Sequence, residues 1–240
     1  MSNPYFQFKQ FTVWHDQCAM KVGTDGVLLG AWTSVQGAHS ILDVGTGTGL
    51  VALMLAQRSL PNTNIVALEI DEAAARQAKE NIVRSPWKKQ IEVVQADFRK
   101  YQSPEKFDVI VSNPPYFVDS LGCPDQQRNS ARHNDSLTYE ELLEGVTGLL
   151  TENGTFTIVI PMDVADRVKM IASEKKLQAV RQLNVITKPG GIPKRTLITF
   201  SFSNQECIVE ELLTEVARHQ YSKEYIALTH VSRGFVFSRY

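Results

Sequence analysis

Short apolar runs alternate with segments of helical periodicity through most of the chain. Runs rich in Val, Ile and Leu predict strands at residues 40–44, 64–70, 91–95, 108–113, 155–160, 177–186 and 196–202. Apolar residues three or four positions apart predict helices at residues 50–58, 72–83, 140–150, 164–174 and 210–218. Strands that alternate with helices in this way are typical of an α/β fold with a mostly parallel sheet.

The two ends of the chain depart from this alternation. Residues 3–14 are rich in aromatic side chains and predict a short hairpin or arm, and Thr24 or Asp25 can cap a following helix. Residues 118–136 lack periodicity, and a long polar loop beside a binding edge is typical of a substrate loop or lid. The expected division is an N-terminal aromatic arm and capping helix at 1–35, and a main domain at 36–240 with the substrate loop at 118–136 and a C-terminal tail at 203–240.

A glycine-rich turn follows the first strand of the main domain. Its residues are Gly45, Thr46, Gly47, Thr48 and Gly49. Gly45 permits a tight turn, Gly47 lets a ligand approach the backbone, and Gly49 lets the next helix pack closely on the strand. The order of strand, glycine turn and helix makes this a credible cofactor site, with Thr46 among its contacts. Asp43, just before the turn, disfavours an anionic pyrophosphate and suits a ligand with a positive amine.

Acidic residues also end the next two strands. Glu69 lies 26 positions after Asp43, close to one strand–helix repeat, so both are expected at the same edge of the sheet. Glu69 can accept hydrogen bonds from ribose hydroxyls, with Ile70 beside it. Asp97 can accept a hydrogen bond from an adenine amine while Phe98 flanks the ring, although a turn or a helix cap also explains Asp97.

A stiff exit ends the strand at 108–113. Its residues are Asn113, Pro114, Pro115, Tyr116 and Phe117. The prolines lack the N–H that a sheet ladder needs, so the chain must leave the sheet after Asn113. The Asn113 side-chain oxygen and the Pro114 carbonyl can accept both N–H groups of a planar amine, and Tyr116 can stack on the flat group. Asn113, Pro114 and Tyr116 are therefore the predicted catalytic residues, with Pro115 and Phe117 toward the substrate.

Composition narrows the class of protein without identifying it. The chain has 240 residues, of which 43% are hydrophobic and 21% charged, which fits a globular domain and argues against disorder. The apolar runs are too short for a membrane span and the N-terminus lacks a signal pattern, so we expect a cytoplasmic protein. The three cysteines are widely spaced and form no CxxC pair, so no metal site is expected. We expect a monomer or a weak homodimer.

The formal net charge of −1 means that a nucleic-acid partner must meet a local basic patch. The loop at 118–136 offers Arg128, Arg132 and His133, and the segment between the last two predicted strands offers Lys188, Lys194 and Arg195. These six residues are candidate contacts to substrate phosphates. A surface histidine and an ordinary hairpin loop are the interpretations that stay open beside this one.

Four motifs together resemble those of class I S-adenosylmethionine-dependent methyltransferases that act on amines. They are the turn at 43–49, Glu69, Asp97 and the exit at 113–116, in this order. The resemblance covers residues 40–200. It implies a Rossmann-like fold with a seven-stranded, mostly parallel sheet, helices on both faces and an antiparallel last strand. It also implies S-adenosyl-L-methionine as the cofactor.

A closer resemblance spans nearly the whole chain. Residues 8–11, 18–32 and 113–117 are similar to the tRNA adenine-N6-methyltransferases that modify adenine 37, next to the anticodon of a valine tRNA. This resemblance implies that the partner is the anticodon stem-loop of that tRNA, with the target adenine flipped out of its stack. It also implies that Lys21, Thr24 and Asp25 line the cofactor side of the pocket.

Other planar amines suit the same catalytic arrangement. Guanine N2 of ribosomal RNA, adenine of DNA and the side-chain amide of a protein glutamine are alternative substrates. A protein that binds cofactor or RNA without catalysis is an alternative of another class. The intact motif at 113–116 disfavours that last alternative, because a binding scaffold has no need of this set of residues.

Overall fold

The computed structural model describes residues 3–18, 21–115, 137–218 and 220–231. Within these ranges, no helix combines the length and the apolar character needed to cross a membrane. The elements in chain order are β1 (Tyr5–Gln7), β2 (Thr12–Trp14), α1 (Thr24–Trp32), β3 (Ser40–Val44), α2 (Leu50–Arg58), β4 (Asn64–Glu69), α3 (Glu72–Val83), β5 (Ile91–Gln95), the 3-10 turn η1 (Phe98–Lys100), β6 (Phe107–Ser112), α5 (Tyr139–Leu149), β7 (Leu150–Pro161), the 3-10 turn η2 (Met162–Val164), α6 (Ala165–Glu174), β8 (Gln178–Ile186), β9 (Arg195–Ser201), β10 (Ile208–Leu213), β11 (Glu215–Ala217), β12 (Gln220–Tyr221) and α7 (Lys223–Val231).

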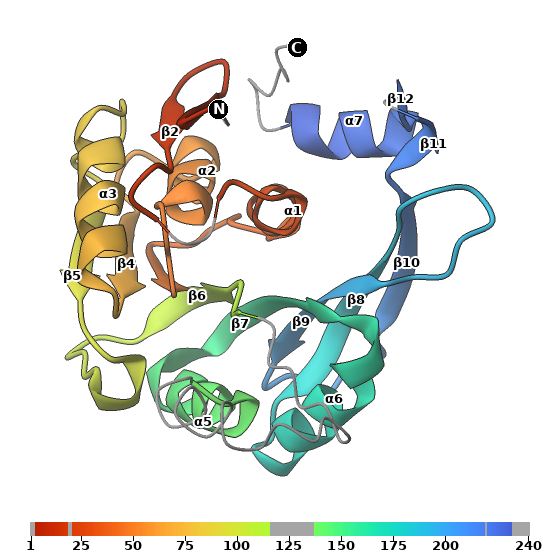
Figure 1. Ribbon diagram of the computed structural model, residues 1–240. Coiled ribbons are helices and arrows are strands. Elements are labelled where there is room, and N and C mark those ends of the chain that lie inside the picture. Colours follow the sequence, from red (N-terminus) through yellow and green to blue (C-terminus); the bar gives the residue numbers. More distant parts are fainter. Residues whose placement is uncertain (1–2, 19–20, 116–136, 219, 232–240) are drawn as a thin grey trace, which may run out of the picture.

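A sheet of eight strands in the order β10-β8-β9-β7-β6-β3-β4-β5 forms the middle layer. Strands β5, β4, β3, β6 and β7 run parallel, β9 is antiparallel to both of its neighbours, and β10 is parallel to β8. Figure 1 shows α1, α2, α3 and α7 on one side of the sheet, and α5 and α6 on the other. The predicted α/β class, the mostly parallel sheet and the helices on both faces are thus confirmed.

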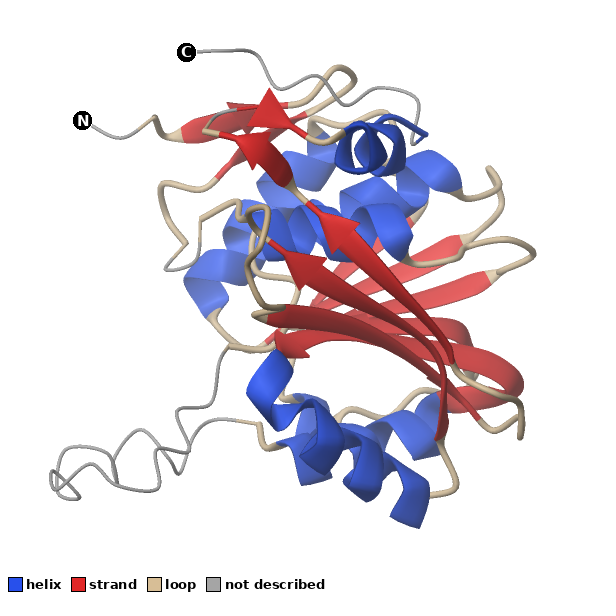
Figure 2. Cartoon of the chain, turned by 90° about the vertical axis from the view of Figure 1, so that its right-hand side faces the viewer, coloured by secondary structure: helices blue, strands red, loops and turns tan. Residues whose placement is uncertain are grey.

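Strands β3 and β6 are neighbours at the centre of the sheet, which Figure 2 shows from the side. Each runs as a nearly continuous apolar stretch, because helices cover both faces of the sheet. The Ser112 hydroxyl at the end of β6 donates a hydrogen bond of 2.9 Å to the Val44 carbonyl at the end of β3. This bond fixes the carboxyl ends of the two strands side by side, and in open α/β sheets ligands bind outside such ends.

The predicted aromatic hairpin is confirmed at the N-terminus. β1 and β2 pair in antiparallel fashion, with Tyr5 opposite Trp14 and their rings 4.9 Å apart between centroids. Between the strands, the rings of Phe8 and Phe11 stack at 4.5 Å, and both side chains are buried. Phe11 meets the edge of Trp87 at 5.6 Å, so this arm is anchored on the body of the domain.

The C-terminal region differs from the prediction. The helix predicted at 210–218 is wrong: this segment forms the edge strand β10 and the short strand β11. β10 is an additional strand, so the sheet has eight strands where the resemblance implied seven. Glu and Leu favour helices in isolation, but ladder bonds to β8 and burial of Leu212 decide the structure here.

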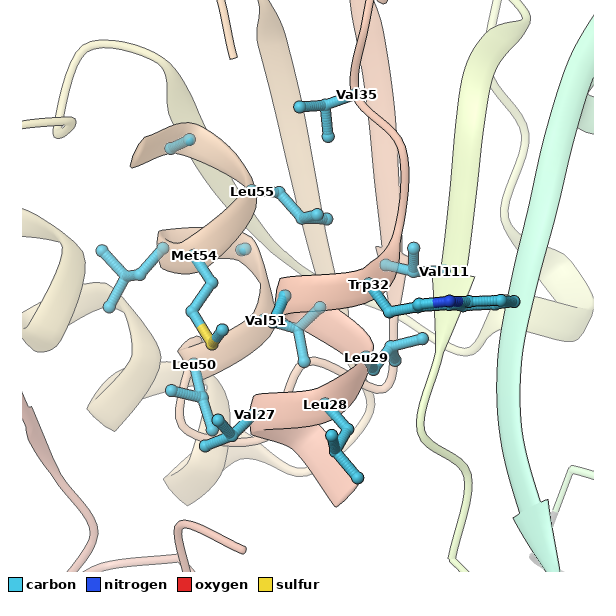
Figure 3. Close-up of a cluster of buried hydrophobic side chains, with 14 of the residues drawn as sticks. Val27, Leu28, Leu29, Trp32, Val35, Leu50, Val51, Met54, Leu55 and Val111 are labelled. Carbon is cyan, nitrogen blue, oxygen red and sulfur yellow. The ribbon is translucent and has the colours of Figure 1, made fainter. Parts of the chain in front are cut away.

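Helices α1 and α2 pack closely over the sheet, and Figure 3 shows the apolar side chains between them. Gly30 makes this approach possible, because a Cβ at that position would lie 2.8 Å from the Met54 Cβ and 2.7 Å from its sulfur. Leu28, Leu29 and Trp32 on α1 are each no more than 4% exposed. Their burial stabilises the domain by roughly 1.5–3 kcal/mol for each side chain.

We expect Gly30→Ala to lower the free energy of unfolding by about 1–3 kcal/mol, since the added methyl group overpacks the contact with Met54. Gly148→Ala in α5 is the matched control, because a Cβ there would meet no atom within 4 Å. Alanine is favoured over glycine in a helix, so this control should stabilise the protein by about 0.5–1 kcal/mol. Urea unfolding measures both changes, and equal effects of the two substitutions would contradict the packing argument.

Candidate active site

The glycine turn between β3 and α2 has an unusual backbone. Gly45, Gly47 and Gly49 have φ values of 73°, 56° and 81°, which L-residues with side chains rarely adopt. The N–H groups of Gly45 and Thr46 both donate to the Leu68 carbonyl at 2.9 Å, which ties the turn to β4. A Cβ at Gly45 would meet no atom of the described residues within 4 Å, so these residues leave open space in front of the backbone of the turn.

Asp43 lies beneath this turn with only 1% of its surface exposed. Its Oδ2 accepts hydrogen bonds from the Thr46 hydroxyl at 2.6 Å and from the Ala52 N–H at 3.1 Å. Burial raises the pKa of the Asp43 carboxyl to about 7, an effect that these two hydrogen bonds oppose. The carboxyl supports the turn and the start of α2 from below, and its place near a ligand amine stays a prediction.

Glu69 reaches the turn from the end of β4. Its Oε2 accepts from the Gly47 N–H at 2.8 Å, and its Oε1 accepts from the N–H groups of Ile70 and Asp71 at 2.9 and 3.0 Å. A carboxylate has about four acceptor sites, so these bonds leave capacity for a hydroxyl donor. Ile70 is 55% exposed beside it. Contacts of Glu69 and Ile70 with the cofactor stay a prediction.

Asp97 follows β5 and is engaged with its own turn. Its Oδ1 accepts from the Arg99 N–H at 3.0 Å, and its carboxylate pairs with the Arg99 guanidinium at 2.9 Å. Arg99 holds the pKa of Asp97 below its usual value. The capping interpretation is therefore confirmed for Asp97. The ring of Phe98 is 6% exposed and packs against Gly145 of α5. Contacts of Asp97 and Phe98 with an adenine stay a prediction.

Asn113 follows directly on β6, and the chain leaves the sheet there as predicted. Pro114 is buried and Pro115 is exposed. In the part of the chain that the structure describes, no side chain or backbone group holds the side-chain amide of Asn113 by a hydrogen bond. The Asn113 oxygen and the Pro114 carbonyl stay a predicted pair of acceptors. Five predicted site residues lie outside the described residues: Tyr116, Phe117, Arg128, Arg132 and His133.

The start of α1 lies against Asn113, which the sequence analysis missed. A Cβ at Gly26 would lie 3.8 Å from the Asn113 Nδ2 and 3.1 Å from the Leu50 Cδ2. Gly26 therefore lets α1 approach both the Asn113 exit and the first residue of α2. The signal was present in the sequence, because a glycine inside a helix costs stability and often marks a close approach.

The predicted cap of α1 is wrong. The N-cap residue is Gly23, and no side chain makes a capping hydrogen bond there. Asp25 instead accepts a hydrogen bond of 3.2 Å from the Arg195 Nε. Arg195 begins β9 opposite Pro161, at the carboxyl end of β7, so the ion pair joins α1 to the same sheet edge. Burial raises the pKa of Asp25, and Arg195 opposes that shift.

The other predicted contacts lie at the surface. Lys21 and Thr24 are exposed before and at the start of α1, and Lys188 and Lys194 are exposed in the loop between β8 and β9. The structure thus gathers the glycine turn, Glu69, Asn113 and the start of α1 at the carboxyl ends of β3, β4 and β6. Arg195 differs from Lys188 and Lys194, which are exposed in the same region, because it pairs with Asp25 on α1.

An open sheet in this order, with a glycine turn after β3 and an Asn-Pro-Pro exit after β6, defines a class I methyltransferase that uses S-adenosylmethionine. A family model for the methyltransferase small domain matches residues 22–187. A tRNA1(Val) (adenine(37)-N6)-methyltransferase of Bacteroides thetaiotaomicron is 80% identical over 229 residues, which are 95% of this chain and 97% of the relative. The chain belongs to the family of tRNA1(Val) (adenine(37)-N6)-methyltransferases.

A more distant relative supports the family, and a solved structure supports the fold. A tRNA1(Val) (adenine(37)-N6)-methyltransferase of Tolumonas auensis is 43% identical over 228 residues, which are 95% of this chain and 96% of the relative. Among solved structures, a predicted O-methyltransferase from Agrobacterium tumefaciens matches with a TM-score of 0.67 at 16% identity, over 86% of this chain and 96% of that chain. At this identity, the match supports the fold alone.

The buried carboxyl beneath the turn predicts a pH dependence. In the folded chain Asp43 keeps its proton up to about pH 7, whereas its ordinary pKa is 3.8. Between these values the folded state binds more protons than the unfolded state, so this group lowers the free energy of unfolding as the pH rises from about 4 to about 7. Asp43→Asn keeps an acceptor for Thr46 and Ala52 and removes the titration.

The stability of the variant relative to the wild type should therefore increase with pH over that window and level off above it. Urea unfolding of both proteins between pH 4 and pH 8 measures the difference. Parallel curves across the whole range would contradict the assignment of a raised pKa to Asp43.

Proposed function

We propose that this protein transfers a methyl group from S-adenosyl-L-methionine to the N6 amine of adenine 37 in tRNA1(Val). The observation that carries the proposal is the placement of Asn113 and Pro114 beside the glycine turn, in a chain 80% identical to a relative of that name. Both features lie at the carboxyl ends of adjacent parallel strands, which is where open α/β sheets bind ligands.

The chemistry of the target explains the two acceptors. The lone pair of an exocyclic adenine amine is delocalised into the ring, so the nitrogen is a weak nucleophile. The Asn113 side-chain oxygen and the Pro114 carbonyl accept its two N–H groups and orient the lone pair. Bound S-adenosylmethionine supplies an electrophilic methyl group on sulfur. The N6–carbon bond forms as the sulfur–carbon bond breaks, and the amine then loses a proton to water.

Positioning accounts for most of the rate enhancement in this scheme. Holding two reacting groups in near-attack geometry is worth roughly 7–11 kcal/mol. The proline exit after β6 and the Asp25–Arg195 ion pair both restrict movement at the amine side. Tyr116 is proposed to stack on the target base, with Pro115 and Phe117 nearby, and stacking is worth about 1–3 kcal/mol per base.

The residues present fit S-adenosylmethionine. The positive φ values at Gly45 and Gly47 expose the backbone of the turn, and of the residues that the structure describes a Cβ at Gly47 would meet only Cys18, at 4.0 Å. Glu69 offers acceptor capacity for ribose hydroxyls at the end of β4. We propose that the turn residues, including Thr46 and Gly49, hold the cofactor together with Glu69 and Ile70, and that Lys21 and Thr24 lie toward it.

The substrate side carries the basic residues. We propose that Lys188 and Lys194, which are exposed in the β8–β9 loop, contact phosphates of the anticodon stem-loop. Arg195 is proposed to act at the same edge while it is paired with Asp25. The proposed active unit is a monomer or a weak homodimer. A tRNA substrate would place the reaction in the cytoplasm.

The first test is methyl transfer from labelled S-adenosylmethionine to unmodified total tRNA, followed by nucleoside mass spectrometry. We expect N6-methyladenosine, and sequencing of the labelled tRNA should identify the valine species. N2-methylguanosine would keep the fold and the chemistry but overturn the substrate. The same assay is run in parallel with ribosomal RNA, DNA and protein, and label in one of these with none in tRNA would overturn tRNA as the partner.

Asn113→Ala should lower the rate of methyl transfer by about 100-fold or more, because a misplaced amine loses its near-attack geometry. Cofactor affinity, measured by calorimetry with S-adenosylhomocysteine, should stay near that of the wild type, since the side chain acts on the amine. A fully active Asn113→Ala variant would exclude the proposed role of the side chain.

Lys188→Ala and Lys194→Ala should each weaken tRNA binding and reduce the slope of log affinity against log salt by about 1. Lys106→Ala is the matched control. Lys106 is also exposed, but it lies at the amino ends of the parallel strands, far from the proposed site at their carboxyl ends. The Lys106 carbonyl accepts a hydrogen bond there from the Ser40 hydroxyl at the start of β3. Filter binding between 50 and 200 mM salt measures the slopes. Equal slopes for all three variants would remove the β8–β9 loop from the tRNA interface.

A further inference from the structure

Helix α3 carries two buried amide side chains, Asn81 and Gln77, on one face. They are one helical turn apart, and each is only 1% exposed. Buried amides are retained where their donors and acceptors are satisfied, since an unpaired polar group inside a protein costs free energy. Neither residue belongs to the methyltransferase motifs. The hydrogen bonds of Asn81 and Gln77 show which segments these two side chains hold in place.

Asn81 joins the N-terminal arm to the glycine turn. Its Nδ2 donates to the Thr48 carbonyl in the turn at 2.9 Å and to the Trp14 carbonyl at the end of β2 at 2.9 Å. Its Oδ1 accepts from the Trp14 N–H at 2.9 Å. One buried amide thus makes three hydrogen bonds and fixes two segments far apart in sequence relative to each other.

Gln77 holds the residues that follow β2. Its Nε2 donates to the Asp16 Oδ1 at 2.7 Å, and its Oε1 accepts from the Gln17 N–H at 3.2 Å. We call residues 14–18 the strap. Figure 1 shows the chain after β2 passing beside α3 and α2 on its way to α1. Together, the two amides of α3 fix the strap at both Trp14 and residues 16–17.

The strap ends at the open side of the glycine turn. The Cys18 sulfur lies 4.0 Å from the position that a Cβ of Gly47 would occupy, and among the described residues no other neighbour comes within 4 Å of that position. The backbone N–H of the same Gly47 donates a hydrogen bond to the Glu69 carboxylate at the end of β4. The strap therefore borders the space in front of the turn, where the cofactor is proposed to bind.

We propose that Asn81 and Gln77 are positioning residues for cofactor binding, which act by holding the strap across the glycine turn. The inference rests on the proposed function, because it takes S-adenosylmethionine as the ligand of the turn. If the strap is already fixed before the cofactor binds, the cofactor does not have to order it. The entropy cost of binding is then smaller, and the affinity for the cofactor is higher. Loss of either amide would free the strap, and loss of Asn81 would also leave the buried Thr48 carbonyl without this hydrogen bond.

Calorimetry with S-adenosylmethionine tests this inference without any tRNA. Asn81→Ala and Gln77→Glu should each weaken cofactor binding by about tenfold or more, as the loss of buried hydrogen bonds predicts. In Gln77→Glu the new carboxylate faces Asp16, whereas in the double variant Gln77→Glu/Asp16→Asn the amide of residue 16 can donate to it. We expect the double variant to bind the cofactor within about threefold of the wild type.

The matched control is Thr63→Val. Its buried hydroxyl donates to the Ala38 carbonyl at 2.8 Å, in the loops just before β3 and β4 and away from the turn. This variant should lose stability to urea but keep wild-type cofactor affinity. Wild-type affinity in Asn81→Ala and Gln77→Glu, despite similar losses of stability, would overturn the inference and leave the proposed function intact. A wild type that does not bind S-adenosylmethionine would overturn both.

Discussion

The structure depends on one tight turn that neighbouring elements hold in place. Gly45, Gly47 and Gly49 all take positive φ values within five residues, and without side chains they have little to pack with. Other groups must therefore fix the backbone. Asp43 does so from β3 and Glu69 from β4, while α3 contributes a buried amide. Because these groups come from different elements, the turn also fixes the arrangement of two strands and two helices.

The two halves of the site are held by different physical means, and α1 joins them. Hydrogen bonds to buried polar groups hold the glycine turn, whereas prolines and the Asp25–Arg195 ion pair restrict the amine side. Gly26 lets α1 contact both Asn113 and α2, and Gly30 lets it pack closely on α2. A shift of α1 would therefore move the amine side relative to the helix that begins at the glycine turn.

Local patterns predicted the central strands and the helices that cover them, because the strands are continuous apolar runs and the helices repeat apolar residues three or four positions apart. The central strands and the helices that follow them begin and end close to their predicted bounds, except that β7 begins at Leu150, five residues before its predicted start at residue 155. The glycine turn follows its strand as predicted. β10 was predicted as a helix because an edge strand with mixed exposure has no clear period, and its pairing with β8 is a contact between distant segments. Contacts between distant segments also explain why the prediction that Thr24 or Asp25 caps α1 was wrong. Asp25 pairs instead with Arg195, which is 170 residues away in the sequence.

For the site, the sequence revealed which chemical groups gather but not which way each group faces. Asp43 was predicted from its charge to lie near a ligand amine, and nothing in its sequence context indicated that its carboxyl is 1% exposed and supports the turn. Asn81 gave no motif, because its partners lie 33 and 67 positions away. It faces two carbonyls and one N–H, and an asparagine amide satisfies that set with two donors and one acceptor. An aspartate of the same size would set its oxygens against both carbonyls, so the choice of amide over acid follows from the segments that it joins.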